Sequence, residues 1–370
     1  MSEAKFHRGM PPLKSGAKTM SFFEFWPMWL FYPPVFVYTV WLMIRYRGVL
    51  LPTVANPTFP GGGYYGESKS EILALARQHI APWIAPFTLI DRPLLNSGDD
   101  ADEFAAIKRQ LETASLNFPL VAKPDLGCRG AGVKVMSNDA QLQAYLAHFP
   151  GHARFLLQTL IAHEGEAGVF YCRRPHERRG RIVSLTLKYF PHVVGDGRRT
   201  LRDLILADPR ASRVPHLYLQ RNAARLDDVP AAGEAVRLAF AGSHSRGAIF
   251  KDGTALVTPA MEARFESLAR ALPEFHFGRF DIRFENFADL QAGRDFTILE
   301  INGAGAETTH IWDSDTSLLQ AWRDLMRQYR WLYEIGAANR RRGHQTMTFS
   351  AFRRASLREH QLTPQYPPTD

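Results

Sequence analysis

Residues 280–284 read FDIRF and residues 296–302 read FTILEIN, and these two segments decide the fold class. In both, charged or amide residues alternate with large apolar ones, which is the period of a β-strand with one face on a core. Each strand therefore has an apolar face for packing and a polar face for chemistry. The polar faces carry Arg279, Asp281 and Arg283 on the first strand and Glu300 and Asn302 on the second, and the apolar faces carry Phe280, Ile282, Phe284, Leu299 and Ile301.

If the two strands pair, Asp281 meets Glu300 and Asn302 at one place. Three oxygen donors on one spot suit Mg²⁺, which also holds water and substrate phosphates; Mn²⁺ is the second choice. Arg279 and the Gly-rich turn at 303–305 favour a site here over an exposed polar face without a ligand, which is the alternative.

The rest of the chain alternates between strand and helix patterns, and strands often follow strands. This order favours an α+β fold with largely antiparallel sheets over a doubly wound parallel fold. We expect further strands over 118–123, 132–136, 155–160, 169–173, 181–190, 235–241 and 247–250, and helices after Ser68 and Thr258, over 101–115, 138–149, 200–207 and 215–226, and near the C-terminus.

A lysine and a glycine loop follow one of these strands: residues 121–124 read VAKP and residues 127–132 read GCRGAG. Glycines let backbone N–H groups approach a phosphate closely, and Lys123 adds a compact positive charge. The loop lacks the Gly-Lys-Ser/Thr of a Walker motif. A plain turn between two strands is the alternative.

The whole chain of 370 residues is long enough for two or three packed units, and its formal charge of +8 favours anionic partners. No nucleic-acid-binding motif accompanies that charge, so we expect no nucleic-acid partner. Two cysteines, Cys128 and Cys172, argue against a disulfide framework and for a reducing compartment.

Residues 22–44 are strongly apolar and aromatic, with Glu24 as their one charged residue. A helix of this length would reach about 34 Å, enough to cross a bilayer core of roughly 30 Å. Pro27, Pro33 and Pro34 argue against one straight helix, and basic residues on both sides give no orientation. We expect a membrane-spanning helix or a re-entrant hairpin; an aromatic arm packed on the protein or on a second copy is the alternative.

Over roughly residues 100–335 the chain resembles the ATP-grasp superfamily, and within it the D-alanine–D-alanine ligase-like, carboxylate–amine ligase branch. The resemblance rests on the order of several motifs, of which Glu300-Ile-Asn302 with the upstream Asp281 is the most specific. In sequence they are Lys123-Pro124, the glycine loop, Gln158-Thr-Leu-Ile161, Glu166, Lys188, Arg246, Asp281 and Glu300-Ile-Asn302.

The resemblance implies two α+β subdomains that grip ATP between antiparallel sheets, to which this chain adds its N-terminal hydrophobic helix or hairpin. It also implies roles. Lys123 and Lys188 would contact the phosphates of ATP, and the loop with Gly127, Gly130 and Gly132 would close over them. Gln158 and Leu160 would lie at the adenine hinge, and Glu166 would lie near the ribose. Asp281, Glu300 and Asn302 would bind Mg²⁺, and Arg246 and Arg279 would neutralise the transferred phosphoryl group.

These expectations define an ATP- and Mg²⁺-dependent ligase that joins a carboxylate to an amine through an acyl-phosphate. We expect it at the inner or plasma membrane, with the catalytic domain facing the cytoplasm, a lipid, lipid-linked or cell-envelope substrate, and a homodimer as a candidate assembly. A kinase-like phosphotransferase and a non-catalytic nucleotide-binding membrane scaffold are the alternatives. The expected parts are a membrane-associating segment (1–50), a linker and helical region (51–117), a small ATP-grasp subdomain (118–190), a large subdomain with the metal site (191–340) and a loosely held basic tail (341–370).

Overall fold

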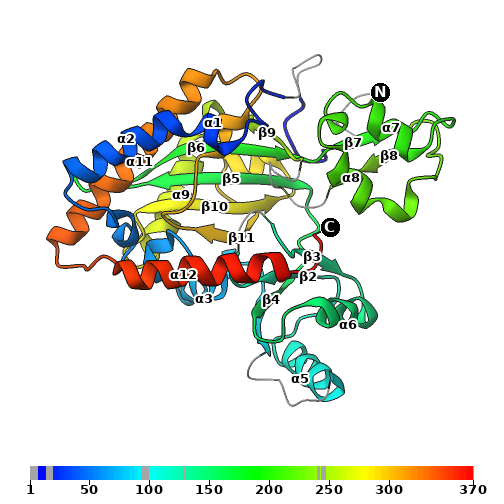
Figure 1. The fold of residues 1–370 in the computed structure, drawn as a ribbon, viewed down its shortest axis with the longest axis horizontal. Helices are drawn as coiled ribbons and strands as arrows, with labels where there is room; N and C mark the ends of the chain where they lie inside the picture. The colour runs from blue at the N-terminus through cyan, green and yellow to red at the C-terminus, as the bar shows by residue number, and fades with distance from the viewer. Residues whose placement is uncertain are drawn as a thin grey trace.

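The computed structural model describes residues 7–13, 20–92, 100–127, 130–239, 242 and 247–369. Its centre is a five-stranded antiparallel sheet in the order β11–β10–β5–β6–β9 (Figure 1). The strands are β5 (Gly165–Cys172), β6 (Arg181–Tyr189), β9 (Ile249–Asp252), β10 (Phe277–Phe284) and β11 (Phe296–Asn302).

Helices cover both faces of this sheet. Apolar residues of α3 (Lys69–Ile80) and α9 (Pro259–Ala271) pack on one face, where Phe265, Phe280 and Ile298 share a core. The long helix α11 (Leu318–Arg341) packs on the other face through residues such as Leu332 and Ile335. Burial of the apolar residues on both sides of the sheet is the main force that holds it in place.

A second, four-stranded antiparallel sheet has the order β1–β4–β2–β3. Two helices pack on it, α5 (Asp100–Thr113) and α6 (Asp139–His148), around a separate core that includes Ile107 and Phe155. A backbone hydrogen bond joins the two sheets: the N–H of Ala85, just before the first strand of this sheet, donates to the carbonyl of Ile298 on β11. The strands are β1 (Phe87–Asp91), β2 (Leu120–Pro124), β3 (Lys134–Met136) and β4 (Arg154–Thr159).

The remaining elements lie outside these two sheets. A two-stranded ribbon lies beside two small helices at one end of the molecule (Figure 1). The ribbon consists of β7 (His192–Val194) and β8 (Ala235–Arg237), and the two helices are α7 (Leu201–Ala207) and α8 (Pro215–Arg221). Elsewhere lie α10 (Phe287–Gln291), α12 (Phe349–Leu362) and short 3₁₀ turns, which are Leu51–Val54, Pro60–Gly63, Ala81–Trp83, Ala211–Arg213, Ala223–Arg225, Thr254–Leu256, Thr309–Trp312 and Thr363–Gln365.

The predicted α+β class with antiparallel sheets is confirmed. The sheet membership differs from the expected subdomains, because β5 and β6 pair with β10 and β9 in the large sheet although they lie before residue 190. The tail also differs. Residues Phe349–Leu362 form a helix whose Phe352 ring packs against Tyr64 and Tyr65, so this segment is not loosely held.

The predicted position of Leu299 on the apolar face of β11 is wrong. A β-bulge lies between Asp281 and Ile282, and the register moves from Asp281–Glu300 to Ile282–Ile298. Leu299 is therefore the extra residue, and Ile298 shares the core face with Ile301 in its place. The bulge leaves Glu300 and Asn302 on the polar side, as predicted.

The N-terminal apolar segment does not form one long helix. It comprises α1 (Met28–Phe31) and α2 (Pro33–Arg45), and α2 packs along α11 with Val35 and Leu42 buried. A 13-residue helix is about 20 Å long, short of a bilayer core of roughly 30 Å. Across the described parts of the chain, none of the helices has the length and apolar character needed to span a membrane, so the membrane-spanning form of the prediction is not supported.

Candidate functional site

The predicted pairing of the two decisive strands places Asp281 opposite Glu300 and Arg279 opposite Asn302 on the polar side of the large sheet. Asn302 Nδ2 donates a hydrogen bond to Asp281 Oδ2 at 2.9 Å. The expected pairing is therefore correct, and all three predicted metal ligands lie together with one predicted catalytic residue, Arg279.

Asp281 is held by two cations. Its Oδ1 accepts hydrogen bonds from Lys188 Nζ at 2.8 Å and from Arg279 Nε at 3.0 Å, and its Oδ2 accepts one from an Arg279 guanidinium nitrogen at 3.0 Å. Burial disfavours the ionised carboxyl, but Arg279 and Lys188 outweigh that penalty and hold the pKa of Asp281 well below its usual range. Asp281 is therefore an anion at neutral pH whose two oxygens are already in use.

Lys188 links Asp281 to a second acid. Its Nζ lies 3.1 Å from Glu166 Oε1, and Glu166 also accepts a hydrogen bond from Arg283 Nε at 3.4 Å. Burial acts against both charges, but the attraction within the cluster raises the pKa of Lys188 and lowers that of Glu166. Arg283 donates in addition to the carbonyl of Ile161 at 2.6 Å. Glu166, expected near the ribose, is thus a buried member of an ion-pair network in this structure.

The second predicted lysine, Lys123, lies on β2 of the four-stranded sheet, which we call the small sheet. Lys123 Nζ donates to Gln158 Oε1 at 2.6 Å, and Gln158 Nε2 donates across to the carbonyl of Leu299 on β11 at 3.3 Å. Burial lowers the pKa of Lys123, and the nearby carboxylates of Glu300 and Glu166 offset this only in part. Lys123 thus faces the acidic strand pair from the opposite sheet, with an amide oxygen rather than a carboxylate as its hydrogen-bond acceptor.

The strand that carries Gln158 continues into the predicted adenine hinge. The backbone N–H of Leu160 donates to the carbonyl of Pro119 at 3.2 Å, so the hinge is tied to the strand that carries Lys123. The adenine-binding role of Gln158 and Leu160 stays a prediction.

The glycine loop adopts the backbone conformation that glycine permits. Gly127, Gly130 and Gly132 have φ angles of 129°, 71° and 69°. Thr369 from the C-terminal segment accepts a hydrogen bond from the Gly132 N–H at 3.0 Å and donates to the Gly130 carbonyl at 2.8 Å. Tyr366 donates to the carbonyl of Leu126 at 2.8 Å, so the C-terminus covers this loop. Cys128 and Arg129 of the loop lie outside the described residues.

Two site residues were missed by the sequence analysis. Lys69 Nζ lies 3.8 Å from Glu300 Oε1 and donates to the Gly127 carbonyl, so it connects the acidic strands to the glycine loop. Glu67 accepts a hydrogen bond from the Gly303 N–H at 3.4 Å, and burial raises its pKa to about 7. The cap at Ser68 predicts a helix start here, and the structure confirms it, but a cap does not say which sheet the preceding residues meet.

Two of the three oxygen donors fit Mg²⁺. The Glu300 side chain is 27 % exposed, and its described ion pair, with Lys69, is long at 3.8 Å. Glu300 and the amide oxygen of Asn302 therefore suit a hard cation, whereas Asp281 is engaged by Lys188 and Arg279. Within the described ranges no group of three or more His, Cys, Asp or Glu side chains is arranged to hold a metal ion. A cation here would therefore take its remaining ligands from water and phosphate.

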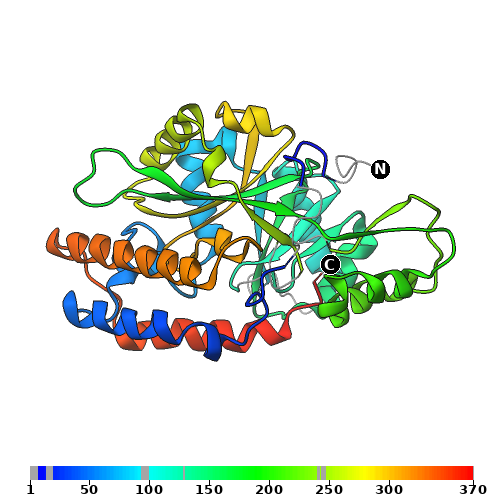
Figure 2. The ribbon, with the colours of Figure 1, turned by 90° about the horizontal axis from the view of Figure 1, so that it is seen from above.

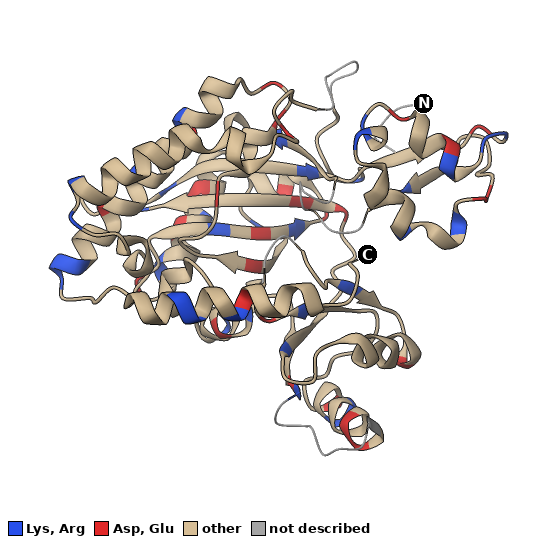
Figure 3. Ribbon diagram, viewed as in Figure 1, with Lys and Arg blue, Asp and Glu red and all other residues tan. Residues whose placement is uncertain are grey.

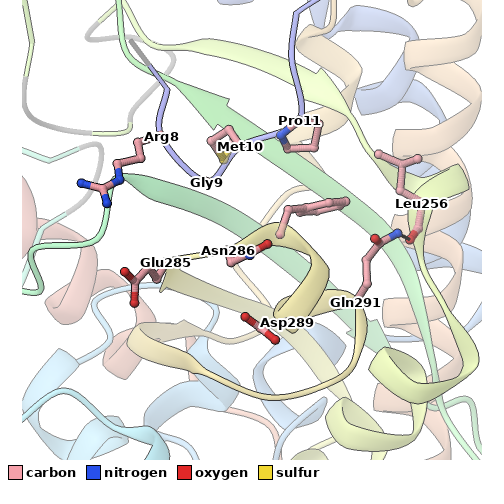
Figure 4. A pocket seen from close by; sticks show the side chains of 10 residues that line it. Arg8, Gly9, Met10, Pro11, Leu256, Glu285, Asn286, Asp289 and Gln291 are labelled. Atoms are coloured by element: carbon pink, nitrogen blue, oxygen red, sulfur yellow. Dashed lines mark hydrogen bonds between the residues drawn. The ribbon is translucent and has the colours of Figure 1, made fainter. Parts of the chain in front are cut away.

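Arg246, the other predicted catalytic residue, lies outside the described residues and is not placed. Two cavities elsewhere contain none of the predicted site residues. One, of about 700 Å³, lies between residues 8–11 and residues 285–291, and the polar side chains that line it are those of Arg8, Glu285, Asn286, Asp289 and Gln291 (Figure 4). The other, of about 590 Å³, lies beside α3 and β1.

Neither a scan against protein-family models nor a search of curated proteins finds a match to the chain. Among solved structures, the chain is similar to a bifunctional glutathione synthetase from Pasteurella multocida, with 13% identity and a TM-score of 0.36 over 70% of this chain and 35% of that one. The match therefore spans about a third of the length of that enzyme.

The chain is also similar to the D-cycloserine synthetase DcsG, with 15% identity and a TM-score of 0.37, over 71% of this chain and 70% of that one. The resemblance to the ATP-grasp superfamily stays a prediction from the sequence. Because both TM-scores are below 0.5, the roles assigned below rest on the site geometry of this chain.

Proposed function

We propose that this protein is an ATP-dependent ligase that joins a carboxylate to an amine through an acyl-phosphate. The observation that carries the proposal is the opposition of Lys123 on the small sheet to Lys188, Arg279, Glu300 and Asn302 on the large sheet. Cations from two sheets around one acidic edge suit a triphosphate and its Mg²⁺, and phosphoryl transfer depends mainly on positioning and charge neutralisation.

In the proposed reaction, a carboxylate oxygen of the first substrate attacks the γ-phosphorus of ATP and ADP leaves. The amine of the second substrate then attacks the acyl carbon, the C–O bond to phosphate breaks, and the amine gives up a proton. Lys123 and Lys188 would hold phosphate oxygens, and Arg279 and Arg246 would offset the charge of the transferred group. Bound Mg²⁺, or Mn²⁺, would supply further charge neutralisation, with Glu300 and Asn302 as its protein ligands and Asp281 supporting them.

We further propose that the reaction takes place at the inner or plasma membrane, with the catalytic domain on the cytoplasmic side, and that one substrate is a lipid, lipid-linked or cell-envelope molecule. The apolar N-terminal segment supports this location. Tyr32, between α1 and α2, donates a hydrogen bond to Glu307 at 2.8 Å, and the Glu307 carbonyl accepts one from Arg279 at 3.0 Å. The apolar segment therefore contacts the edge of the site.

The test is to incubate the protein with ATP, Mg²⁺, candidate carboxylates and hydroxylamine, which traps an acyl-phosphate as a hydroxamate. We expect a hydroxamate with the true substrate, and a loss of turnover of roughly 100-fold or more in Glu300→Gln with an unchanged unfolding midpoint. ADP formation without any hydroxamate would instead identify a phosphotransferase. Near-normal turnover in Glu300→Gln would remove the proposed metal ligand.

A further inference from the structure

The N-terminal helices leave one large apolar face uncovered. Ten large apolar side chains between residues 22 and 44 are exposed. Among them, Trp29 is 75% exposed, Ile44 72%, Phe36 65% and Trp41 51%. Isolated apolar side chains are ordinary on protein surfaces, but a continuous group of this kind marks an interaction site.

This exposure follows from how α2 is attached. Val35, Thr39 and Leu42 recur at helical spacing and are buried, so one side of α2 is fixed on the protein. Since α2 is apolar around most of its circumference, burying one side leaves the opposite side, with Phe36 and Val40, in water. The helix is therefore neither a core helix nor an ordinary amphipathic surface helix.

No charge interrupts the uncovered face within 22–44. Glu24, the one charged residue there, is buried and bound by Arg210, whose guanidinium nitrogens lie 2.5 and 3.1 Å from its carboxylate. This pair removes the single acid of the segment from the surface and ties the segment to the loop before α8. In Figure 3, α1 and α2 carry no charged position before Arg45, the last residue of α2.

A second helix gives this layer a positive charge. The views in Figures 1 and 2 place α12 in the same outer layer as α2, and α11 lies between α2 and the large sheet. α12 exposes Phe349 and Leu357, at 68% and 46%, together with Arg353, Arg354 and Arg358. Aromatic residues beside arginines match the boundary between the acyl chains and the anionic headgroups of a bilayer.

We infer that the layer formed by α1, α2 and α12 docks on the surface of an anionic bilayer, with the apolar side chains of α1 and α2 inserted in one leaflet and the α12 arginines on the headgroups. Docking in the plane of the interface needs no helix that spans the bilayer. This inference rests on and deepens the membrane part of the proposed function. It does not depend on the ligase chemistry.

The test measures binding of the full chain to vesicles, without ATP or turnover. We expect co-sedimentation with vesicles of phosphatidylcholine and phosphatidylglycerol, weaker binding to phosphatidylcholine alone, and a loss of roughly tenfold or more in Trp29→Ser/Trp41→Ser. Phe36→Ser/Ile44→Ser is an independent second variant, and circular dichroism checks that each is folded. Leu206→Ser on α7, where Leu206 is 49% exposed, is the matched control and should bind like the original protein.

Two outcomes would overturn the inference. The first is a folded protein that does not bind either kind of vesicle. The second is a dimer in solution that becomes a monomer in Trp29→Ser/Trp41→Ser while vesicle binding is unchanged, because a second copy would then be the occupant of the face. Since no turnover is measured, failure here leaves the hydroxamate test of the ligase reaction unaffected.

Discussion

Lys123 and Lys188 are the same residue type on two facing sheets, yet their pKa values move in opposite directions. Removal from water favours the neutral amine in both. For Lys188, the carboxylates of Asp281 and Glu166 outweigh this effect and raise its pKa. For Lys123, burial wins and lowers its pKa, and its hydrogen-bond acceptor is the neutral side chain of Gln158.

The difference indicates that the lysines of the two sheets have separate roles. Lys188 belongs to a network in which Asp281 and Glu166 each have a second cationic partner, Arg279 and Arg283, so its charge holds these two acids in place as well as facing phosphate. Lys123 has no hydrogen-bonded carboxylate among the described residues, so an arriving phosphate gains more from it. The large sheet is then the fixed half of the site, and the small sheet supplies the cation that responds to nucleotide.

The largest expected effect comes from breaking the fixed half. Lys188→Met should lower the free energy of unfolding by about 3 kcal/mol or more, because it leaves two buried carboxylates without one of their partners. Urea unfolding measures this change. The control is Lys108→Met, which removes an exposed ion pair with Asp139 at 2.8 Å and should cost less than about 1 kcal/mol. Equal losses in the two variants would contradict the division proposed here.

Lys123→Met should produce the reverse pattern. We expect unfolding free energy within about 1 kcal/mol of the original protein, because the residue loses one hydrogen bond to an amide. ATP affinity should fall roughly 10- to 100-fold, the range expected when a charged hydrogen bond worth about 1.5–3 kcal/mol is lost. Titration calorimetry with ATP measures the affinity. Unchanged ATP binding would show that the small sheet does not supply the responsive cation.

Glu67 extends the comparison to a carboxyl group. Burial raises its pKa from 4.5 to about 7, and the attraction of Lys69 does not cancel the shift. Between these two pH values the folded state holds a proton that the unfolded state has lost, so this group makes stability fall as pH rises from about 4.5 to 7. Glu67→Gln should flatten that part of the curve, with the variant gaining about 3 kcal/mol relative to the original protein between pH 4 and pH 8, because one pKa unit corresponds to about 1.4 kcal/mol.

The measurement for Glu67 is the unfolding free energy of both proteins in urea at several pH values. Glu71→Gln is the control, because Glu71 lies on the same helix start and its side chain is 54% exposed. A constant difference between Glu67→Gln and the original protein from pH 5 to 8 would mean that Glu67 has an ordinary pKa.

The strand pair was predictable because its information is local. Alternation in two short segments assigns Asp281, Glu300 and Asn302 to one side, and the structure keeps them there despite the bulge. The bulge itself was not predictable, because Ile298 and Leu299 are adjacent apolar residues and either one could lie on the core face. The pairing of Asp281 with Arg279 on its own strand also needs side-chain positions that alternation does not supply.

The parts that were missed depend on contacts between distant segments. Lys69 reaches Glu300 across 231 residues of chain, that is 300 minus 69, and nothing local marks it as a site residue. Strand β1 is short and lies after a Pro-containing turn, and it exists because β4 offers a partner along its whole length. Helix α12 was predicted as a basic tail because few of its residues are buried, Leu362 among them, so its sequence has little apolar pattern.

The smallest expected effect concerns the loop beside Lys123. Thr369 bridges Gly130 and Gly132, and Thr369→Val keeps the shape of the side chain while removing both hydrogen bonds. Two such bonds are worth about 1–3 kcal/mol together, but the C-terminus also loses order when it is released, so we expect a decrease in unfolding free energy of about 1 kcal/mol or less.

The informative readout for Thr369→Val is ATP affinity rather than stability. In this structure Thr369 occupies the Gly132 N–H, which is the kind of donor that a phosphate would use. Releasing that donor should leave the affinity unchanged or raise it up to about threefold, whereas Lys123→Met lowers it. Val133→Ala changes the same loop without touching the Thr369 bonds and serves as the control. If Thr369→Val instead weakened ATP binding as much as Lys123→Met does, the C-terminus would be holding the loop in its binding conformation, and the responsive half of the site would include it.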